Sequence, residues 1–310
     1  MFRYLVVRVV EIIPVVFFIT VASFLLIHLV PGDPAQILLG RQATPAAVSR
    51  LHAELGLDRS LPTQYWHFVR GAATFDFGTS IQTGEDVGSL VSRRMGPSFL
   101  LIGYALIVTL LLAVPLALVS ATRRGTWVDG TIRLMSTVTF VMPVFWMALV
   151  LVTVFSLKLG IFPTSGYGNS FLQHLRSLTL PAITLGLSLS PLLMRVLRSS
   201  LIDTMHAEHI EAAHARGLSD RRVLLKHVLR NSSTSTLTLV GFLFAVLLSA
   251  TVVVEQIFGI PGLGSLLISA VERRDLMVVQ ALSLLFAIVV LTASLATDLI
   301  YAVLDPRVRL

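Results

Sequence analysis

The chain has 310 residues, of which 55% are hydrophobic and only 13% are charged, and its mean hydropathy is +0.84. About a quarter of the residues of an ordinary soluble domain are charged, so this composition excludes that class and indicates a polytopic membrane protein. Cysteine is absent, which excludes disulfides, cysteine-based metal sites and a cysteine nucleophile.

Apolar segments of membrane-spanning length recur along the chain. They are roughly Ile12 to Val30, Ser98 to Ala121, Ile132 to Leu157, Leu178 to Leu201, Leu237 to Phe258 and Val278 to Leu304. Each is near or above the ~20 residues that a tilted transmembrane helix needs. The first carries no charge and no small-residue cleavage pattern follows it, so we expect it to remain as a membrane anchor. The predicted fold is all-α with six transmembrane helices.

The positive charges are distributed like a topology signal. Lys and Arg gather before the first span, between the second and third, between the fourth and fifth, and after the sixth, while the short loops on the other side hold few. The positive-inside rule therefore predicts that the N- and C-termini are both cytoplasmic. Topology explains the net charge of +7, so we expect contact with membrane lipid and no binding of nucleic acid.

The first outer loop, residues 31–97, is too long to be a simple connection and contains helix signals. Thr44 and Pro45 have the pattern of a helix start, and that helix should end before Gly56. A second helix is expected over Leu61 to Ala73. We therefore divide the chain into a first segment and span (1–30), an extracytoplasmic helical loop (31–97) and a five-helix core (98–310).

A polar, basic segment, residues 203–230, lies between the fourth and fifth spans and must face water. A first helix should begin near its start and end at Gly217, because glycine readily adopts the left-handed conformation that closes a helix. A second helix should begin at Ser219, whose hydroxyl could cap the free amides of the next turn, and continue through Arg230.

A glycine-rich string, Glu255 to Gly264, follows the fifth span. Pro261, Gly262 and Gly264 permit a tight re-entry of the chain, and a short helix should follow over Ser265 to Val271.

The chain lacks the residues of an ATPase. A phosphate-binding loop ends in Gly-Lys-Ser or Gly-Lys-Thr, whereas both lysines of this sequence, Lys158 and Lys226, follow leucine. ATP could therefore drive this protein only through another chain.

Two other kinds of site find little support. Candidate metal ligands gather in the polar segment: His206, His209, Glu211 and His214. Their order matches no zinc-enzyme pattern and no second-shell carboxylate accompanies them, so polar contacts at a protein interface are the better interpretation. An intramembrane hydrolase would need paired groups, but Asp298 and Glu255 are each alone in their spans. We expect no enzyme activity.

Within the polar segment, Glu211-Ala212-Ala213, three further residues and Gly217-Leu218 resemble the EAA loop of permease subunits in ATP-binding-cassette importers. The resemblance implies that Glu211, Ala212, Ala213, Gly217 and Leu218 couple the permease to an ATPase subunit. The family motif usually closes with an apolar residue and proline, where this chain has Asn231 to Ser235.

Other strings resemble the dipeptide and oligopeptide permeases in particular. They are Asp76-Phe77-Gly78 with Ser80 after Tyr65-Trp66, the Pro261-Gly262-Leu263-Gly264 string, Arg274-Asp275, Arg3-Tyr4 with Arg8, and Asp305-Pro306-Arg307. The resemblance covers the chain from end to end. Asp76, Phe77, Gly78, Ser80, Pro261, Gly262 and Gly264 form the expected outer-loop structural motif.

This resemblance implies the permease fold of a type I importer in the bacterial cytoplasmic membrane. The implied partners are two ATPase subunits, which would hold ATP and Mg, a second homologous permease, and an extracytoplasmic solute-binding protein that delivers di- or oligopeptides. The chain itself should hold no cofactor and no metal. The alternatives are a proton- or ion-coupled secondary carrier, or an importer permease for nickel or another small solute.

Overall fold

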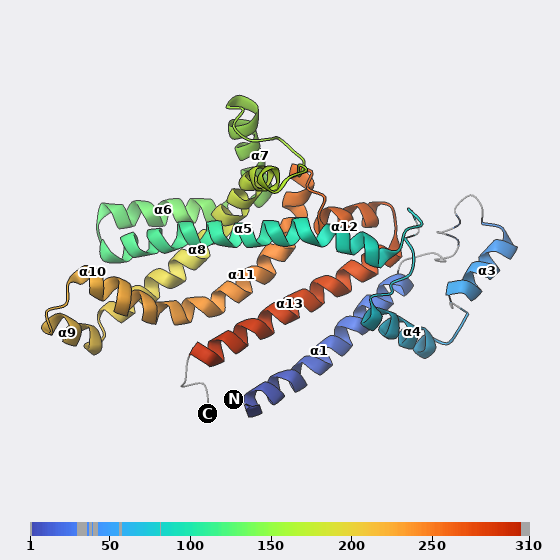
Figure 1. Ribbon diagram of the computed structural model, residues 1–310, viewed down its shortest axis with the longest axis horizontal. Coiled ribbons are helices and arrows are strands. Elements are labelled where there is room, and N and C mark those ends of the chain that lie inside the picture. Colours follow the sequence, from blue (N-terminus) through green and yellow to red (C-terminus); the bar gives the residue numbers. More distant parts are fainter. Residues whose placement is uncertain are drawn as a thin grey trace. The chain divides into compact units, whose positions relative to one another are not determined.

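The computed structural model describes residues 2–29, 36, 39, 43–55, 58–80 and 82–304. In this part of the chain the regular structure is helical, apart from one isolated bridge between Thr79 and Asp86. The elements are α1 (Phe2–Leu29), α3 (Pro45–Leu55), α4 (Leu61–Thr74), α5 (Val87–Thr122), α6 (Trp127–Val141), α7 (Val144–Leu151), η2 (Val152–Lys158), α8 (Phe171–Met205), α9 (Glu208–Ala215), α10 (Asp220–Val223), η3 (Leu224–Val228), α11 (Leu229–Phe258), α12 (Leu263–Glu272) and α13 (Leu276–Leu304) (Figure 1).

The chain forms two compact units. Unit 1 consists of Met1–Leu5, Pro97–Ser265 and Val290–Leu310, and unit 2 of Val6–Gly96 and Leu266–Val289. The long helices α5 and α13 therefore contribute residues to both units.

Helix α8 is the centre of unit 1. It packs against α6, α7 and α11, and its buried side chains occur along most of its length, from Leu178 to Leu201. A Cβ at Gly186 would collide with Val108 of α5, so the absence of a side chain lets these two helices approach closely.

Unit 2 is held together by aromatic and amide contacts on α1. The ring of Tyr65, from α4, makes edge contacts with Phe17 and Phe24 of α1. Ser23 and Gln280 exchange hydrogen bonds of 3.1 Å, each side chain donating to the other's backbone carbonyl, and this joins α1 to α13. Such polar contacts satisfy groups that lipid could not.

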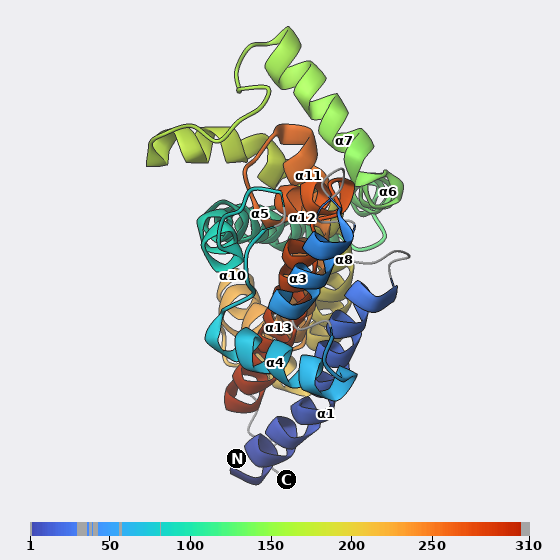
Figure 2. The ribbon, with the colours of Figure 1, turned by 90° about the vertical axis from the view of Figure 1, so that its right-hand side faces the viewer.

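The expected spans are confirmed in part. Four described helices are long and apolar enough to cross a membrane: Val87–Thr122, Phe171–Met205, Leu239–Phe258 and Leu276–Thr297. The predicted third span is instead a broken pair, since α6 and α7 meet at 103° (Figure 2). Pro143 lies at the break as the N-cap of α7, and proline has no amide hydrogen to continue a helix. The predicted first span lies in α1, whose described apolar stretch, Val10–Leu25, is shorter than the four helices above, and Val30 lies outside the described residues.

The loop helices agree with their sequence signals. Thr44 precedes α3, and its carbonyl accepts from the Val48 amide at 2.9 Å. The predicted second loop helix is α4, and the short helix after the glycine-rich string is α12. Gly56 and the terminal Asp305-Pro306-Arg307 string lie outside the described residues.

The polar segment folds differently from the expectation in two respects. Its first helix begins at Glu208, because α8 continues through Met205 before the chain turns. Ser219 is the N-cap of α10, but its hydroxyl makes no capping bond, and its carbonyl accepts from the Val223 amide at 2.9 Å instead. Helix α10 then runs through η3 into α11 without the break that a proline would cause.

Candidate functional site

Helix α9 ends in a glycine-dependent cap. Gly217 has φ +79°, its amide donates to the His214 carbonyl at 2.8 Å, and the Leu218 amide donates to the Ala213 carbonyl at 3.4 Å. These two bonds are those of a Schellman motif, in which the residue with positive φ is usually glycine. Gly217 and Leu218 thus fix the corner that follows α9.

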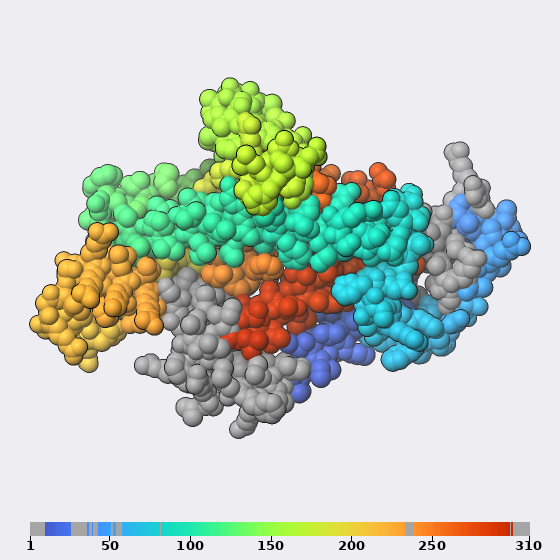
Figure 3. Space-filling view, viewed as in Figure 1, coloured from blue at the N-terminus to red at the C-terminus, as the bar shows by residue number. Residues whose placement is uncertain are grey.

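The two faces of α9 differ in exposure. Ile210 and Ala213 are buried against the protein, whereas Glu211 and Ala212 are exposed. Glu211 also lies in the first turn, where a carboxylate interacts favourably with the helix dipole. The exposed side therefore carries the short Ala212 side chain beside the acidic Glu211, and Figure 3 shows α9 and α10 at one end of the surface of unit 1.

Hydrogen bonds fasten α9 to α11, and α11 in turn to α8. His209 and Asn231 are joined at 3.0 Å between Nε2 and Nδ2. The Ser232 hydroxyl lies 3.1 Å from the Ser200 carbonyl and 3.0 Å from Thr204 Oγ1, which joins α11 to α8. Asn231 and Ser232, in the segment where the family motif usually has a proline, thus form hydrogen bonds that join neighbouring helices.

The histidines of this segment make contacts with other groups of the protein. His206 Nδ1 lies 2.7 Å from the Ile202 carbonyl, and His214 Nε2 lies 3.3 Å from Asp220 Oδ1. Within the described ranges, no group of three or more His, Cys, Asp or Glu side chains could hold a metal ion.

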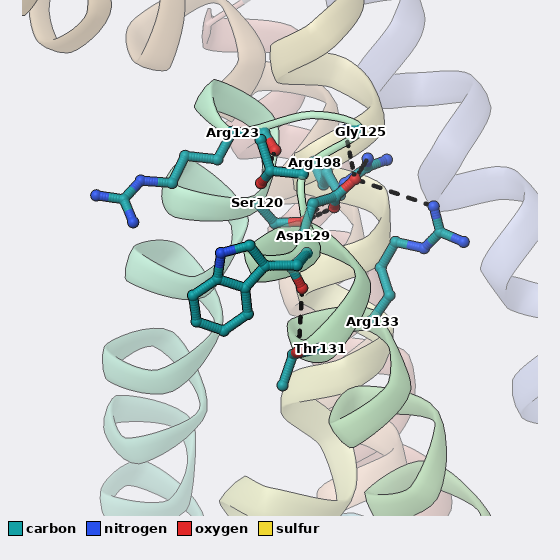
Figure 4. A network of polar contacts seen from close by, with 9 residues as sticks. Ser120, Arg123, Gly125, Asp129, Thr131, Arg133 and Arg198 are labelled. Carbon is teal, nitrogen blue, oxygen red and sulfur yellow. Dashed lines mark hydrogen bonds and ion pairs between the residues drawn. The ribbon is translucent and has the colours of Figure 1, made fainter.

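A buried ion pair joins α5, α6 and α8 (Figure 4). The Asp129 carboxylate is 3% exposed and accepts from Arg198 Nη2 at 2.8 Å. Ser120 donates to the same carboxylate at 2.5 Å and accepts from Arg198 Nε at 2.8 Å. The Gly125 amide, in the turn before α6, donates at 3.2 Å. The carboxylate therefore has both a charge partner and neutral donors.

A cavity of about 280 Å³ lies between the same three helices. Its lining is apolar with a few hydroxyls and thioethers and includes no charged side chain: Leu112, Leu116, Thr131, Ile132, Met135, Ser136, Thr139, Leu187, Ser190, Pro191 and Met194. Ser120 and Arg198 follow Leu116 and Met194 by four residues, one helical turn. The ion pair thus lies one helical turn beyond the cavity along α5 and α8.

The first half of the outer-loop motif meets the start of α13 in unit 2. Ser80 donates to Asp275 Oδ2 at 2.5 Å, and both side chains are buried. Asp76 forms the turn before it, since its Oδ1 accepts from the Gly78 amide at 3.2 Å, while Phe77 is half-buried beside Phe75. Asp76 and Ser80 are therefore engaged in holding the loop.

The second half of the motif surrounds a buried carboxylate in unit 1. Glu255 is fully buried and accepts from Ser98 at 2.5 Å and from the Gly264 and Ser265 amides at 2.8 and 3.1 Å. A Cβ at Gly262 would collide with this carboxylate. Pro261 lies in the turn before α12. The Glu255 carboxylate accepts hydrogen bonds from two amides of the first turn of α12 and so caps that helix.

Comparison with known proteins identifies the family. A model described as "Binding-protein-dependent transport system inner membrane component" matches residues 113–310, and the model for the N-terminal part of such membrane components matches residues 1–100. The chain belongs to this family. Its members are permease subunits of ATP-binding-cassette importers, in which ATP is hydrolysed by separate subunits.

Relatives match this permease over nearly its whole length. A glutathione transport system permease protein of Pectobacterium atrosepticum is 35% identical over 100% of this chain and 99% of its own. A putative peptide transport system permease protein of Brucella abortus is 36% identical over 97% of each chain. The corresponding glutathione permease of Escherichia coli is 33% identical over 100% of this chain and 99% of its own.

Solved structures share the fold. The MetNI methionine ABC transporter, in inward-facing form, aligns with a TM-score of 0.58 at 15% identity, covering 70% of this chain and 96% of that one. An amino acid ABC transporter crystallised with histidines aligns with a TM-score of 0.53 at 16% identity, covering 69% and 93%.

Several polar residues of the permease were not found by sequence reasoning. The sequence patterns predict no pairing of Asp129 with Arg198. Glu255, expected to be alone in its span, has Ser98 as a partner 157 residues away. The available signal was the cost of a charge near or inside an apolar span, which predicts a partner without naming it.

Proposed function

We propose that this chain is the transmembrane permease subunit of an ATP-driven importer in the bacterial cytoplasmic membrane. It would cross the membrane six times, with both termini cytoplasmic, and form the path for di- or oligopeptides that a solute-binding protein delivers. The observation that carries this proposal is the family match over both parts of the chain, together with relatives whose names specify glutathione or peptide transport.

The exposed face of α9 is proposed as the coupling contact. Glu211 and Ala212 would touch an ATPase subunit directly, while Ala213, Gly217 and Leu218 would hold the helix and its corner in place. This division rests on the exposure of the first two residues and on the cap made by the other three. Two ATPase subunits, carrying ATP and Mg, and a second homologous permease would complete the membrane complex.

The cargo proposal rests on the relatives and on the cavity. A cavity whose lining has no charged side chain offers no fixed partner for one particular ion, and so favours weak binding of varied solutes. Specificity would then belong to the binding protein. An importer for nickel or another small solute is the alternative that the same family leaves available.

Purification of the tagged chain in mild detergent tests the proposal. Two cassette ATPases and a second permease should accompany it, and the complex in liposomes should take up labelled dipeptides or glutathione when ATP and the binding protein are present. Recovery of the chain alone, with transport activity of its own, would contradict the importer assignment. Uptake of a metal chelate in place of peptides would correct only the cargo.

A further inference from the structure

The Asp129–Arg198 ion pair has more bonds than a local cap requires. A carboxylate near the start of a helix can be satisfied by nearby amides, and Gly125 already supplies one. Arg198 nevertheless contributes two donors, Nη2 to Oδ2 at 2.8 Å and Nε to Oδ1 at 3.1 Å. This two-point geometry fixes the orientation of the guanidinium as well as its distance.

The ion pair contrasts with the packing beside it. One turn away, α5, α6 and α8 face one another across the cavity, whose apolar walls can shift without breaking a specific bond. A buried pair cannot shift in this way, because separating it leaves a charge without a partner. The ion pair therefore holds the relative position of these three helices more tightly than the cavity walls do.

Arg198 lies close to α9 along the chain. It is seven residues before Met205, the last residue of α8, which corresponds to roughly 10 Å of helix. The bonds of Ser232 to Ser200 and Thr204 reinforce this stretch by joining it to α11. A displacement of α9 should therefore move the end of α8, and Arg198 with it.

We propose that Asp129 and Arg198 are positioning residues for transport, which carry a displacement of α9 to the turn between α5 and α6. The proposal rests on the coupling role proposed for α9. Ser120 would assist by holding both members of the pair, since it donates to Asp129 and accepts from Arg198. Without the pair, α9 and α8 would still move, but the α5–α6 turn would not follow.

The chain has no cysteine, so spin labels can be placed without removing native residues. Arg124, in the α5–α6 turn, and Glu208, at the start of α9, are both exposed and both lie in unit 1. Cysteines at these positions in the assembled importer would carry labels. Their distance distribution would be measured by pulsed electron paramagnetic resonance without nucleotide and after trapping with ATP, Mg and vanadate.

In the parent complex the distance between the labels should be the same in both states, because the turn follows α9. Asp129→Asn should let the distribution change on trapping. The matched control is Arg133→Gln. The Arg133 guanidinium lies 4.0 Å from the same carboxylate, beyond hydrogen-bond distance, and the side chain is 63% exposed. This variant should behave like the parent. An unchanged distance in Asp129→Asn, or a changed one in the parent, would overturn the proposal.

A functional readout separates positioning from general stability. Asp129→Asn should still assemble and hydrolyse ATP, while peptide uptake per ATP falls by a factor within the roughly 5- to 150-fold range of allosteric coupling. If this variant does not assemble, Arg198→Lys tests the proposal instead. Lysine keeps the positive charge but loses the two-point geometry. The distance between the labels should then change on trapping, as expected for Asp129→Asn, with a smaller loss of uptake. Unaltered label distances and uptake in Arg198→Lys would then refute the proposal.

Recovery of the complex and its transport activity distinguish the coupling role of α9 from the positioning role of the ion pair. If no ATPase accompanies the unlabelled parent, the proposed function fails and the positioning role fails with it. If the parent assembles and transports, but Asp129→Asn transports equally well per ATP, only the positioning role fails.

Discussion

At the scale of single residues, Gly217 shows how one backbone conformation can fix a surface. Its φ of +79° closes α9 and orients the Leu218 amide toward Ala213. No atom lies within 4 Å of the position that a Cβ would occupy, so space does not explain the glycine. Backbone conformation does, since a β-branched residue is strained at positive φ.

Gly217→Val should therefore uncouple ATP hydrolysis from transport. The strain should amount to roughly 1 kcal/mol or more, enough to open the corner while the spans remain inserted. The ratio of uptake to ATP hydrolysed in proteoliposomes measures the effect. Gly217→Asn is the control, because asparagine tolerates the left-handed region. Equal coupling ratios in the two variants would contradict this role of the glycine.

Gly262 is constrained by space. A Cβ there would meet the carboxylate of Glu255, which Ser98 and two backbone amides hold in place. Gly262→Ala should thus destabilise the permease by about 1–3 kcal/mol, the usual cost of overpacking. Thermal melting followed by size-exclusion chromatography would show a lower midpoint. The control is Gly130→Ala in α6, where nothing lies within 4 Å of the position of a Cβ, and it should not lower the midpoint. If the two variants melted at the same temperature, the Glu255 carboxylate would have to move aside freely.

At the scale of elements, α9 is built from one buried and one exposed face. Ile210 and Ala213 are buried on one side of it, and Val223 at the end of α10 and Val228 at the end of η3 are buried in the segment that follows. The short helix therefore has a base of buried side chains. This base explains how only eight residues, too few for a stable isolated helix, can present a defined surface.

Enlarging the exposed face should weaken assembly with the ATPase. Ala212→Leu adds three carbon atoms at the proposed contact without touching the buried face, so the ATPase recovered with the tagged chain should fall at least about tenfold, as in the loss of a central interface contact. Ser199→Leu, a comparable enlargement at an exposed position of α8, should leave recovery unchanged. Full recovery of ATPase with Ala212→Leu would place the contact elsewhere.

At the scale of the whole molecule, the membership of an importer family implies a division of labour among chains. We propose that the apolar helices supply the passage, whereas ATP hydrolysis belongs to separate subunits of such importers. The buried polar groups described in each unit have partners: Asp129, Glu255 and Asp275 all accept hydrogen bonds. They suit a structural role better than proton transport.

Uptake by the complete complex should accordingly depend on ATP and not on a proton gradient. In proteoliposomes, labelled peptide should accumulate only with ATP on the ATPase side and binding protein on the other. A protonophore should leave the initial rate unchanged, because no proton crosses with the cargo. Uptake without ATP that the protonophore abolishes would instead identify a secondary carrier.

The sequence by itself determined the helical class, the positions of the apolar helices and the glycine-dependent corner. Hydropathy over ~20 residues and helix capping are local properties, so they can be read without knowing what lies nearby. Pro143 is visible in the sequence, but the break of the third span and its 103° bend are not, because prolines in membrane helices often cause only a kink.

Only the tertiary structure decided which polar residues meet. Asp129 and Arg198 are 69 residues apart, and Ser98 and Glu255 are 157 apart. The cost of burying each charge predicts that it has a partner, but the identity of that partner depends on how α5, α6, α8 and α11 pack. Packing depends in turn on close approaches such as Gly186 against Val108, which no local pattern specifies.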